Sequence, residues 1–147
     1  MVTIVILAVA WPIADVSNDL GLPKLITATL GTSLPAVWVP VTIFVVASLV
    51  TYFIGSSWGS WALMMPLGLS LAATAGASIP LTAAAVFSGG TFGDVTSPLS
   101  GMSAMSSGIA EVEHMDYIRA MTPYNLTAAV IAAGLFLVVP MFALFGV

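Results

Sequence analysis

The sequence predicts an all-α, polytopic membrane protein with discontinuous or re-entrant helices, and three observations lead to this prediction. First, 60% of the 147 residues are hydrophobic and only 5% are charged, whereas a soluble domain has about 25% charged residues. Second, no charged residue or histidine lies between Lys24 and Asp94. A membrane-spanning helix needs about 20 apolar residues, so this stretch can hold two or three crossings. Third, clusters of Gly, Ser and Pro interrupt the apolar segments.

The apolar segments are expected at residues 2–14, 36–54, 61–75, 81–92 and 124–145. The first is short for a span, and it lacks the basic start of a signal peptide, so it is interpreted as a membrane segment. The second is the clearest span. A β-barrel would show ten-residue segments of alternating hydrophobicity, and the sequence has none. We therefore expect one transmembrane domain over residues 1–147.

Two interruptions share the pattern G-x-[ST]-aromatic-G-[SD], at residues 55–60 ("GSSWGS") and within residues 89–101 ("GGTFGDVTSPLSG"). Glycines four residues apart allow close helix packing, whereas Gly/Pro-interrupted segments also indicate the broken helices of transporters. Both interpretations stay open here. The residues assigned to broken helices or to packing are Gly55, Trp58, Gly59, Gly90, Gly93 and Pro98.

Asp94 is the strongest single candidate, because it is the only charged side chain between residues 25 and 110. A charge at membrane depth costs at least about 2.5–3.5 kcal/mol and is tolerated beside a cavity or a bound ion. Desolvation favours a protonated carboxylic acid and a cation favours the carboxylate, so one such group can exchange a proton for a metal ion. The alternative is a loop aspartate that caps a helix at the membrane surface.

Hydroxyl groups surround this residue in the sequence. Hard cations prefer several oxygen ligands, and unwound helices supply them in transporters. The expected cation and proton site consists of Asp94, Ser57, Thr96, Ser97 and Ser100, with Asp94 and Ser97 as ligands of Na⁺.

The remaining chemistry is sparse. His114 is expected to be solvated among Glu111, Glu113 and Asp116, which are expected to form a wet face or a helix start. The chain has two basic residues and no cysteine, which argues against nucleic-acid binding and thiol chemistry. Intramembrane proteolysis would need a second deep carboxylate or a buried histidine beside a serine, so we expect no enzyme and no cofactor.

Three segments resemble the NhaC family of Na⁺/H⁺ antiporters. Residues 55–72 resemble its G-[TS]-S-W-G-T…P segment, and residues 86–100 ("VFSGGTFGDVTSPLS") resemble its S-G-x-x-F-G-D-x-x-S-P-x-S motif. Residues 113–124 resemble its H-x-x-H-V…P-Y stretch. "AVAW", at residues 8–11, also resembles an Ala-Trp further upstream.

The resemblance implies roughly a dozen membrane helices in two related halves, of which this chain matches the C-terminal half. It implies exchange of Na⁺ for H⁺, or transport of organic acids such as malate and lactate in some relatives. By motif match, Asp94, Ser97 and Ser100 belong to the ion path, and Ser57 and Trp58 to the broken segment.

Two departures bear on the transported substrate. The family continues S-P-x-S with Asp-Thr-Thr, whereas this chain has Gly101, Met102 and Ser103, so an expected carboxylate is absent. The Thr-Gln before Pro-Tyr is replaced around Ala120 and Met121.

The leading hypothesis is a Na⁺/H⁺ antiporter in a bacterial or archaeal plasma membrane, with Na⁺ and H⁺ as transported ions. The expected partners are the lipid bilayer and the N-terminal half or another copy. A Na⁺-coupled organic-acid exchanger and a non-transporting relic or subunit remain as alternatives.

Overall fold

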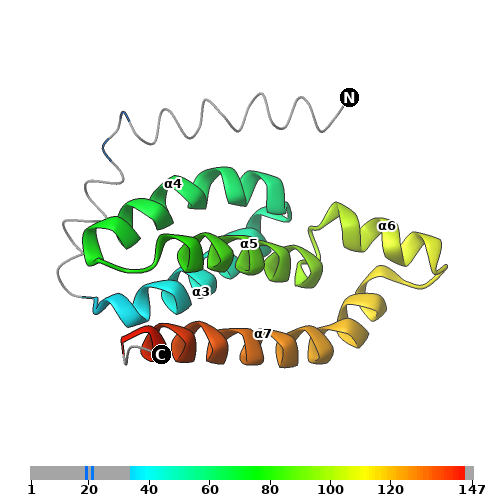
Figure 1. The fold of residues 1–147 in the computed structure, drawn as a ribbon. Coiled ribbons are helices and arrows are strands. Elements are labelled where there is room, and N and C mark those ends of the chain that lie inside the picture. Colours follow the sequence, from blue (N-terminus) through cyan, green and yellow to red (C-terminus); the bar gives the residue numbers. More distant parts are fainter. Residues whose placement is uncertain (1–18, 20, 22–33, 145–147) are drawn as a thin grey trace.

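The described part of the computed structural model comprises residues 19, 21 and 34–144 (Figure 1). The expected apolar segment at residues 2–14 lies outside it. The ordered elements in residues 34–144 are all helical, which confirms the all-α class. They are the 3-10 helix η1 (Ala36–Trp38) and the helices α3 (Val39–Ile54), α4 (Ser57–Ala75), α5 (Ile79–Thr96), α6 (Gly101–Ile109) and α7 (His114–Leu144).

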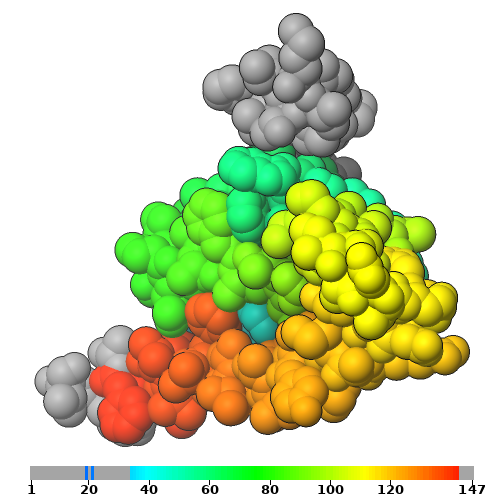
Figure 2. Space-filling model, turned by 90° about the vertical axis from the view of Figure 1, so that its right-hand side faces the viewer, coloured from blue at the N-terminus to red at the C-terminus, as the bar shows by residue number. Residues whose placement is uncertain are grey.

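Helices α3, α4 and α5 lie side by side, with α4 antiparallel to α3 and α5, and α7 lies along α3 and α5 (Figure 1). Because α3 and α5 run in the same direction, the chain breaks after both of them lie at one end of the bundle. Short α6 projects from that end. In Figure 2, which looks onto it, α6 and the first part of α7 (yellow) lie beside the green helices. Four helix ends therefore meet in one place.

The apolar core lies between α3, α4 and α5. Val39, Ala47, Leu71 and Val86 are buried there. Phe44 of α3 contacts Phe136 of α7 with ring centroids 5.5 Å apart, which attaches α7 to this core.

Two of the described helical segments have the length and composition to cross a bilayer, at Ala36–Ile54 and His114–Phe142. The first coincides with the expected span at residues 36–54. The second begins well before the expected start at Tyr124, because α7 continues through Pro123 without ending. Helices that pack in membranes tolerate an internal proline more readily than soluble ones do.

The prediction of a helix interruption at residues 89–101 is wrong for residues 89–96, which are helical. Helix α5 is continuous through Gly89, Gly90, Gly93 and Asp94, and the chain leaves the helix only at Ser97. The two similar sequence patterns thus have different structures, since the segment at 55–60 does contain a helix break.

Close packing explains why α5 carries glycines. A Cβ built at Gly89 would lie 2.5 Å from the carbonyl oxygen of Phe44, and one at Gly93 would collide with the carbonyl oxygen of Ser48. These contacts recur every four residues along two parallel helices. The packing interpretation is therefore correct for α5, whereas Gly59 has no described atom within 4 Å of the same position.

We predict that Gly93→Ala destabilises the protein by about 1–3 kcal/mol, the usual cost of overpacking. Backbone atoms of α3 cannot move aside as a flexible side chain does. Thermal unfolding in detergent measures the change.

Gly134→Ala in α7 is the matched control, because Gly134 is exposed and its added methyl group meets no described atom. Alanine there should be neutral or stabilising. Equal melting temperatures for the two variants would contradict the packing argument.

Candidate functional site

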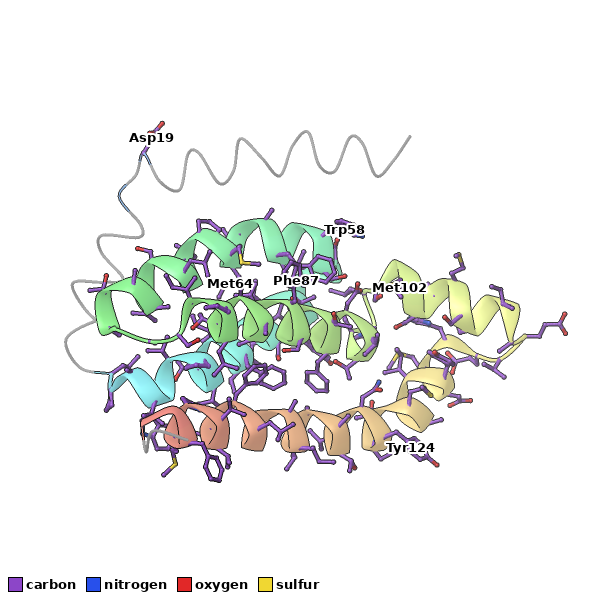
Figure 3. The ribbon with its side chains drawn as sticks, in the orientation of Figure 1. Asp19, Trp58, Met64, Phe87, Met102 and Tyr124 are labelled. Atoms are coloured by element: carbon purple, nitrogen blue, oxygen red, sulfur yellow. The ribbon has the colours of Figure 1, made fainter. Side chains whose placement is uncertain are left out.

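The break between α3 and α4 is two residues long. Gly55 ends α3 with φ of 71°, in the left-handed region, and Ser56 is extended. Ser57 begins α4, and its side chain is buried. Trp58, the next residue, is 51% exposed and lies on the outer side of the helix start (Figure 3). The ring of Trp58 meets Trp61 edge-on, with centroids 5.4 Å apart.

The break between α5 and α6 is the turn Ser97–Ser100, closed by a bond from the amide of Ser100 to the carbonyl of Ser97 at 3.2 Å. The buried hydroxyl of Ser97 donates to the carbonyl of Tyr52 at 2.6 Å, which ties the turn to the end of α3. Leu99 lies against Gly55, where a Cβ would be 2.6 Å from its carbonyl oxygen. The two breaks are thus in direct contact.

The carboxylate of Asp94 lies between these two breaks and is 5% exposed. Its Oδ2 accepts hydrogen bonds from the Ser57 hydroxyl at 2.5 Å and from the Ser57 amide at 3.2 Å. Its Oδ1 accepts one from the Ser100 hydroxyl at 2.6 Å. The side chain therefore joins the last turn of α5 to the first residue of α4 and the start of α6.

Helix dipoles account for this position. A carboxylate in the last turn of its own helix faces the negative end of that dipole, whereas the starts of other helices attract it. Asp94 binds the first amide of α4 directly. It reaches α6 through Ser100, whose Oγ accepts from the amides of Met102 and Ser103 at 3.2 and 3.3 Å. The starts of α4 and α6 thus stabilise the negative charge that the end of α5 destabilises.

The hydroxyls of Ser57 and Ser100 differ in whether they can accept a hydrogen bond from Asp94. A serine oxygen has one hydrogen and two lone pairs. Both lone pairs of Ser100 are used by the α6 amides, so this hydroxyl can only donate to Asp94. Ser57 accepts no described hydrogen bond, so its hydroxyl can either donate to Asp94 or accept from it. A proton on the carboxyl group is therefore best placed on Oδ2, beside Ser57.

The other expected ligands point elsewhere. The hydroxyl of Thr96 bonds to the carbonyl of Phe92 in its own helix at 2.7 Å. Thr96 lines a cavity of about 220 Å³ between α3, α5 and α7, together with Ser48 and Thr122.

Ser97 bonds to Tyr52, so its hydroxyl supports the turn and does not face the carboxylate. Pro98 lies in the turn, and Gly90 packs against the indole of Trp61.

Sequence reasoning missed one buried polar pair and misjudged one residue. The hydroxyls of Thr51 and Ser60 bond at 2.5 Å and link α3 to α4 near the break; two polar residues in apolar helices were the available signal. The prediction that His114 is solvated is wrong, because it is half-buried and both ring nitrogens have partners.

The acidic residues near His114 follow expectation, since Glu111, Glu113 and Asp116 are all exposed around the start of α7. Glu113 accepts from the amides of Met115 and Asp116 at 3.3 and 3.2 Å, so it caps the start of α7. Asp116 and Arg119 are exposed and 3.6 Å apart, a geometry that contributes at most about 1 kcal/mol.

Comparison with known proteins assigns the chain to a family. The sequence model of the Na⁺/H⁺ antiporter family matches residues 1–141. The chain belongs to this family.

Three curated relatives match the chain. The chain is 34% identical to the arginine/ornithine antiporter ArcD of Halobacterium salinarum, over 74% of this chain and 22% of that protein. It is 32% identical to the malate-2H(+)/Na(+)-lactate antiporter of Bacillus subtilis, over 71% of this chain and 22% of the relative. An uncharacterized protein of Haemophilus influenzae is 32% identical over 86% of this chain and 24% of its own length.

The chain spans about a quarter of the length of these curated relatives. Its assignment to a C-terminal half stays a prediction. No solved structure matches the chain.

We predict that Gly55→Ala costs more stability than Gly76→Ala. Both glycines have left-handed φ angles, 71° and 68°, so both substitutions strain the backbone by about 1–3 kcal/mol. Only at Gly55 does the new methyl group also meet the turn, at Leu99, whereas at Gly76 it meets no described atom. Thermal unfolding of both variants isolates the contact between the two breaks, and equal losses would show that this contact is unimportant.

Proposed function

We propose that the protein carrying this chain is a secondary antiporter that exchanges Na⁺ for H⁺, and that Asp94 is the group that takes both ions in turn. The observation that carries the proposal is the placement of one buried carboxylate at the junction of four helix ends. Membership of the Na⁺/H⁺ antiporter family supports it.

The proposed exchange depends on the difference between Ser57, which can donate or accept a hydrogen bond, and Ser100, which can only donate to Asp94. When Asp94 is protonated on Oδ2, the hydroxyl of Ser57 turns to accept, while Ser100 continues to donate to Oδ1. When the proton leaves, the charged carboxylate attracts a cation, and the free lone pairs of Ser57 supply a further oxygen ligand. Proton and cation compete for the same carboxylate, so binding one releases the other.

The placement also suggests how exchange changes the conformation. The charged carboxylate holds the starts of α4 and α6 together through hydrogen bonds to an ionised group, each worth about 1.5–3 kcal/mol. Neutralising it weakens these bonds. We infer that the two breaks loosen when the ion changes, which is what alternating access around a fixed site requires.

A second cargo is supported by specific observations. One relative is named for malate and lactate, another for arginine and ornithine. Gly101 stands where the resemblance leads us to expect an aspartate, and one negative charge fewer favours an organic anion. Uptake of labelled malate or lactate, driven by a Na⁺ gradient, separates this candidate from simple Na⁺/H⁺ exchange.

The proposed protein crosses the cell membrane several times. The apolar faces of α3 and α7 are exposed in the described residues, with Phe53 at 72%, Val130 at 66% and Ile131 at 61%. Lipid and further transmembrane segments, from the N-terminal half or from a second copy, would cover them.

We expect Asp94→Asn to abolish Na⁺-dependent collapse of the pH gradient in everted vesicles, because asparagine takes up neither a proton nor a charge. Adding Na⁺ or Li⁺ to respiring vesicles and following a pH-sensitive dye measures the exchange.

Asp116→Asn is the control, since that carboxylate is exposed and its one ion pair among the described residues is with Arg119. It should exchange at the wild-type rate. Unchanged exchange by Asp94→Asn would refute the role of Asp94.

Ser57→Ala and Ser100→Ala should fail in different ways. Loss of Ser57 removes the switchable hydroxyl, so the half-saturating Na⁺ concentration should rise about tenfold, as for one hydrogen bond to a charged group, and the pH profile should shift. Loss of Ser100 removes an N-cap as well, so stability should fall by about 1 kcal/mol. Transport kinetics and melting temperatures, measured on both variants, test this division; identical behaviour would contradict it.

A further inference from the structure

The Ser97–Ser100 turn determines where the Ser100 hydroxyl points, and it is held from two sides by residues already described. Ser97 fixes it to the end of α3, and Ser100 fixes it to Asp94. Neither contact uses the carbonyl of Pro98, which lies in the middle of the turn. A buried or half-buried carbonyl needs a donor, and the donor comes from a third direction.

That donor is the imidazole of His114. Its Nε2 lies 2.9 Å from the carbonyl oxygen of Pro98, and its Nδ1 lies 3.1 Å from the hydroxyl oxygen of Ser107. A carbonyl oxygen only accepts, so Nε2 carries the hydrogen. In the neutral ring Nδ1 can only accept, so this contact forms when the single hydrogen of the buried Ser107 hydroxyl points to Nδ1 instead of to the carbonyl of Ala104, which lies 3.0 Å away. Both nitrogens are engaged and the ring cannot turn freely.

The connection between α6 and α7 is built to place this ring. The amide of Val112 bonds to the carbonyl of Ser107, and that of Glu111 to the carbonyl of Gly108. This is a Schellman ending, with Glu111 at φ of 54° in the position that glycine usually occupies. Glu113 then caps α7, so His114 is its first residue and faces back towards α6 and the turn.

We propose that His114 is a positioning residue for the Asp94 site. Its bond to Pro98 keeps the turn in the conformation that directs the Ser100 hydroxyl at Oδ1 of Asp94, and its bond to Ser107 fixes the ring. This inference rests on the proposed function, since it assigns His114 a part in ion exchange at that same carboxylate. It adds a third support to the turn, from α7.

Three variants test it. His114→Ala removes both bonds. His114→Gln keeps a side-chain N–H near the position of Nε2, so it can still donate to Pro98. His114→Asn is shorter and places its amide near Nδ1, so it keeps only the contact with Ser107. The expected order of function is wild type, then Gln, then Asn and Ala.

The first measurement is Na⁺/H⁺ exchange in everted vesicles. The half-saturating Na⁺ concentration should rise about threefold to tenfold in His114→Ala, as for loss of one ordinary hydrogen bond, with a smaller change in maximal rate. His114→Gln should remain within about twofold of the wild type. Equal impairment by Gln and Ala, or an unchanged half-saturating concentration in Ala, would overturn the proposal.

The second measurement does not depend on transport. Amide hydrogen exchange of the peptide covering residues 99–103, read by mass spectrometry of the purified protein, should be faster in His114→Ala and restored in His114→Gln. Unchanged exchange in both variants would show that His114 does not order the turn. A wild-type protein that exchanges no ions would refute the proposed function and the role in it, while this readout would still decide the structural claim.

Ser107→Ala provides a milder variant if His114→Ala fails to fold. It leaves the imidazole present and removes only the hydroxyl at Nδ1. Amide exchange over residues 99–103 should then rise in the same direction but less than for His114→Ala, and no change would count against the proposal.

Discussion

The carboxylate of Asp94 is the interaction on which the rest of this arrangement depends. It satisfies the first amide of α4, and through Ser100 it meets the start of α6. A buried charge is costly unless it has partners, and here the partners come from two chain breaks that lie far apart in the sequence. The charge and the breaks therefore require one another: without the breaks Asp94 has no donors, and without Asp94 the start of α4 lacks an acceptor.

Parallel packing of α3 and α5 brings the two breaks together. Gly89 and Gly93 let α5 approach the backbone of α3 at Phe44 and Ser48, and Ser97 continues the same spacing to Tyr52. Because these contacts follow each other every four residues, they fix the register of the helices. The register in turn sets the height of Asp94 relative to Ser57. Glycines remote from the carboxylate thus contribute to the site by determining where the helices end.

The same end of the bundle combines rigid and adjustable parts. Ser97, Ser100 and the backbone of the turn have fixed hydrogen-bonding roles, whereas the Ser57 hydroxyl can donate or accept. An ion exchanger needs this combination, because the ligands must hold a cation and still tolerate a proton in its place. Membership of the Na⁺/H⁺ antiporter family and this geometry both support the proposed exchange.

The sequence by itself predicted the helical class, the candidate span at residues 36–54 and the break at Gly55, and it singled out Asp94 as a candidate, because hydropathy and an isolated charge are local properties. It also included Ser57 and Ser100, which bond to Asp94 in the structure, among the expected ligands. It misplaced the second break, since glycines in a helix look alike whether they loosen it or let a neighbour approach. Only the tertiary structure decided that the hydroxyls of Thr96 and Ser97 bond to backbone carbonyls and that His114 contacts the turn. Those outcomes depend on helix register and on contacts between residues distant in the chain, which no local pattern contains.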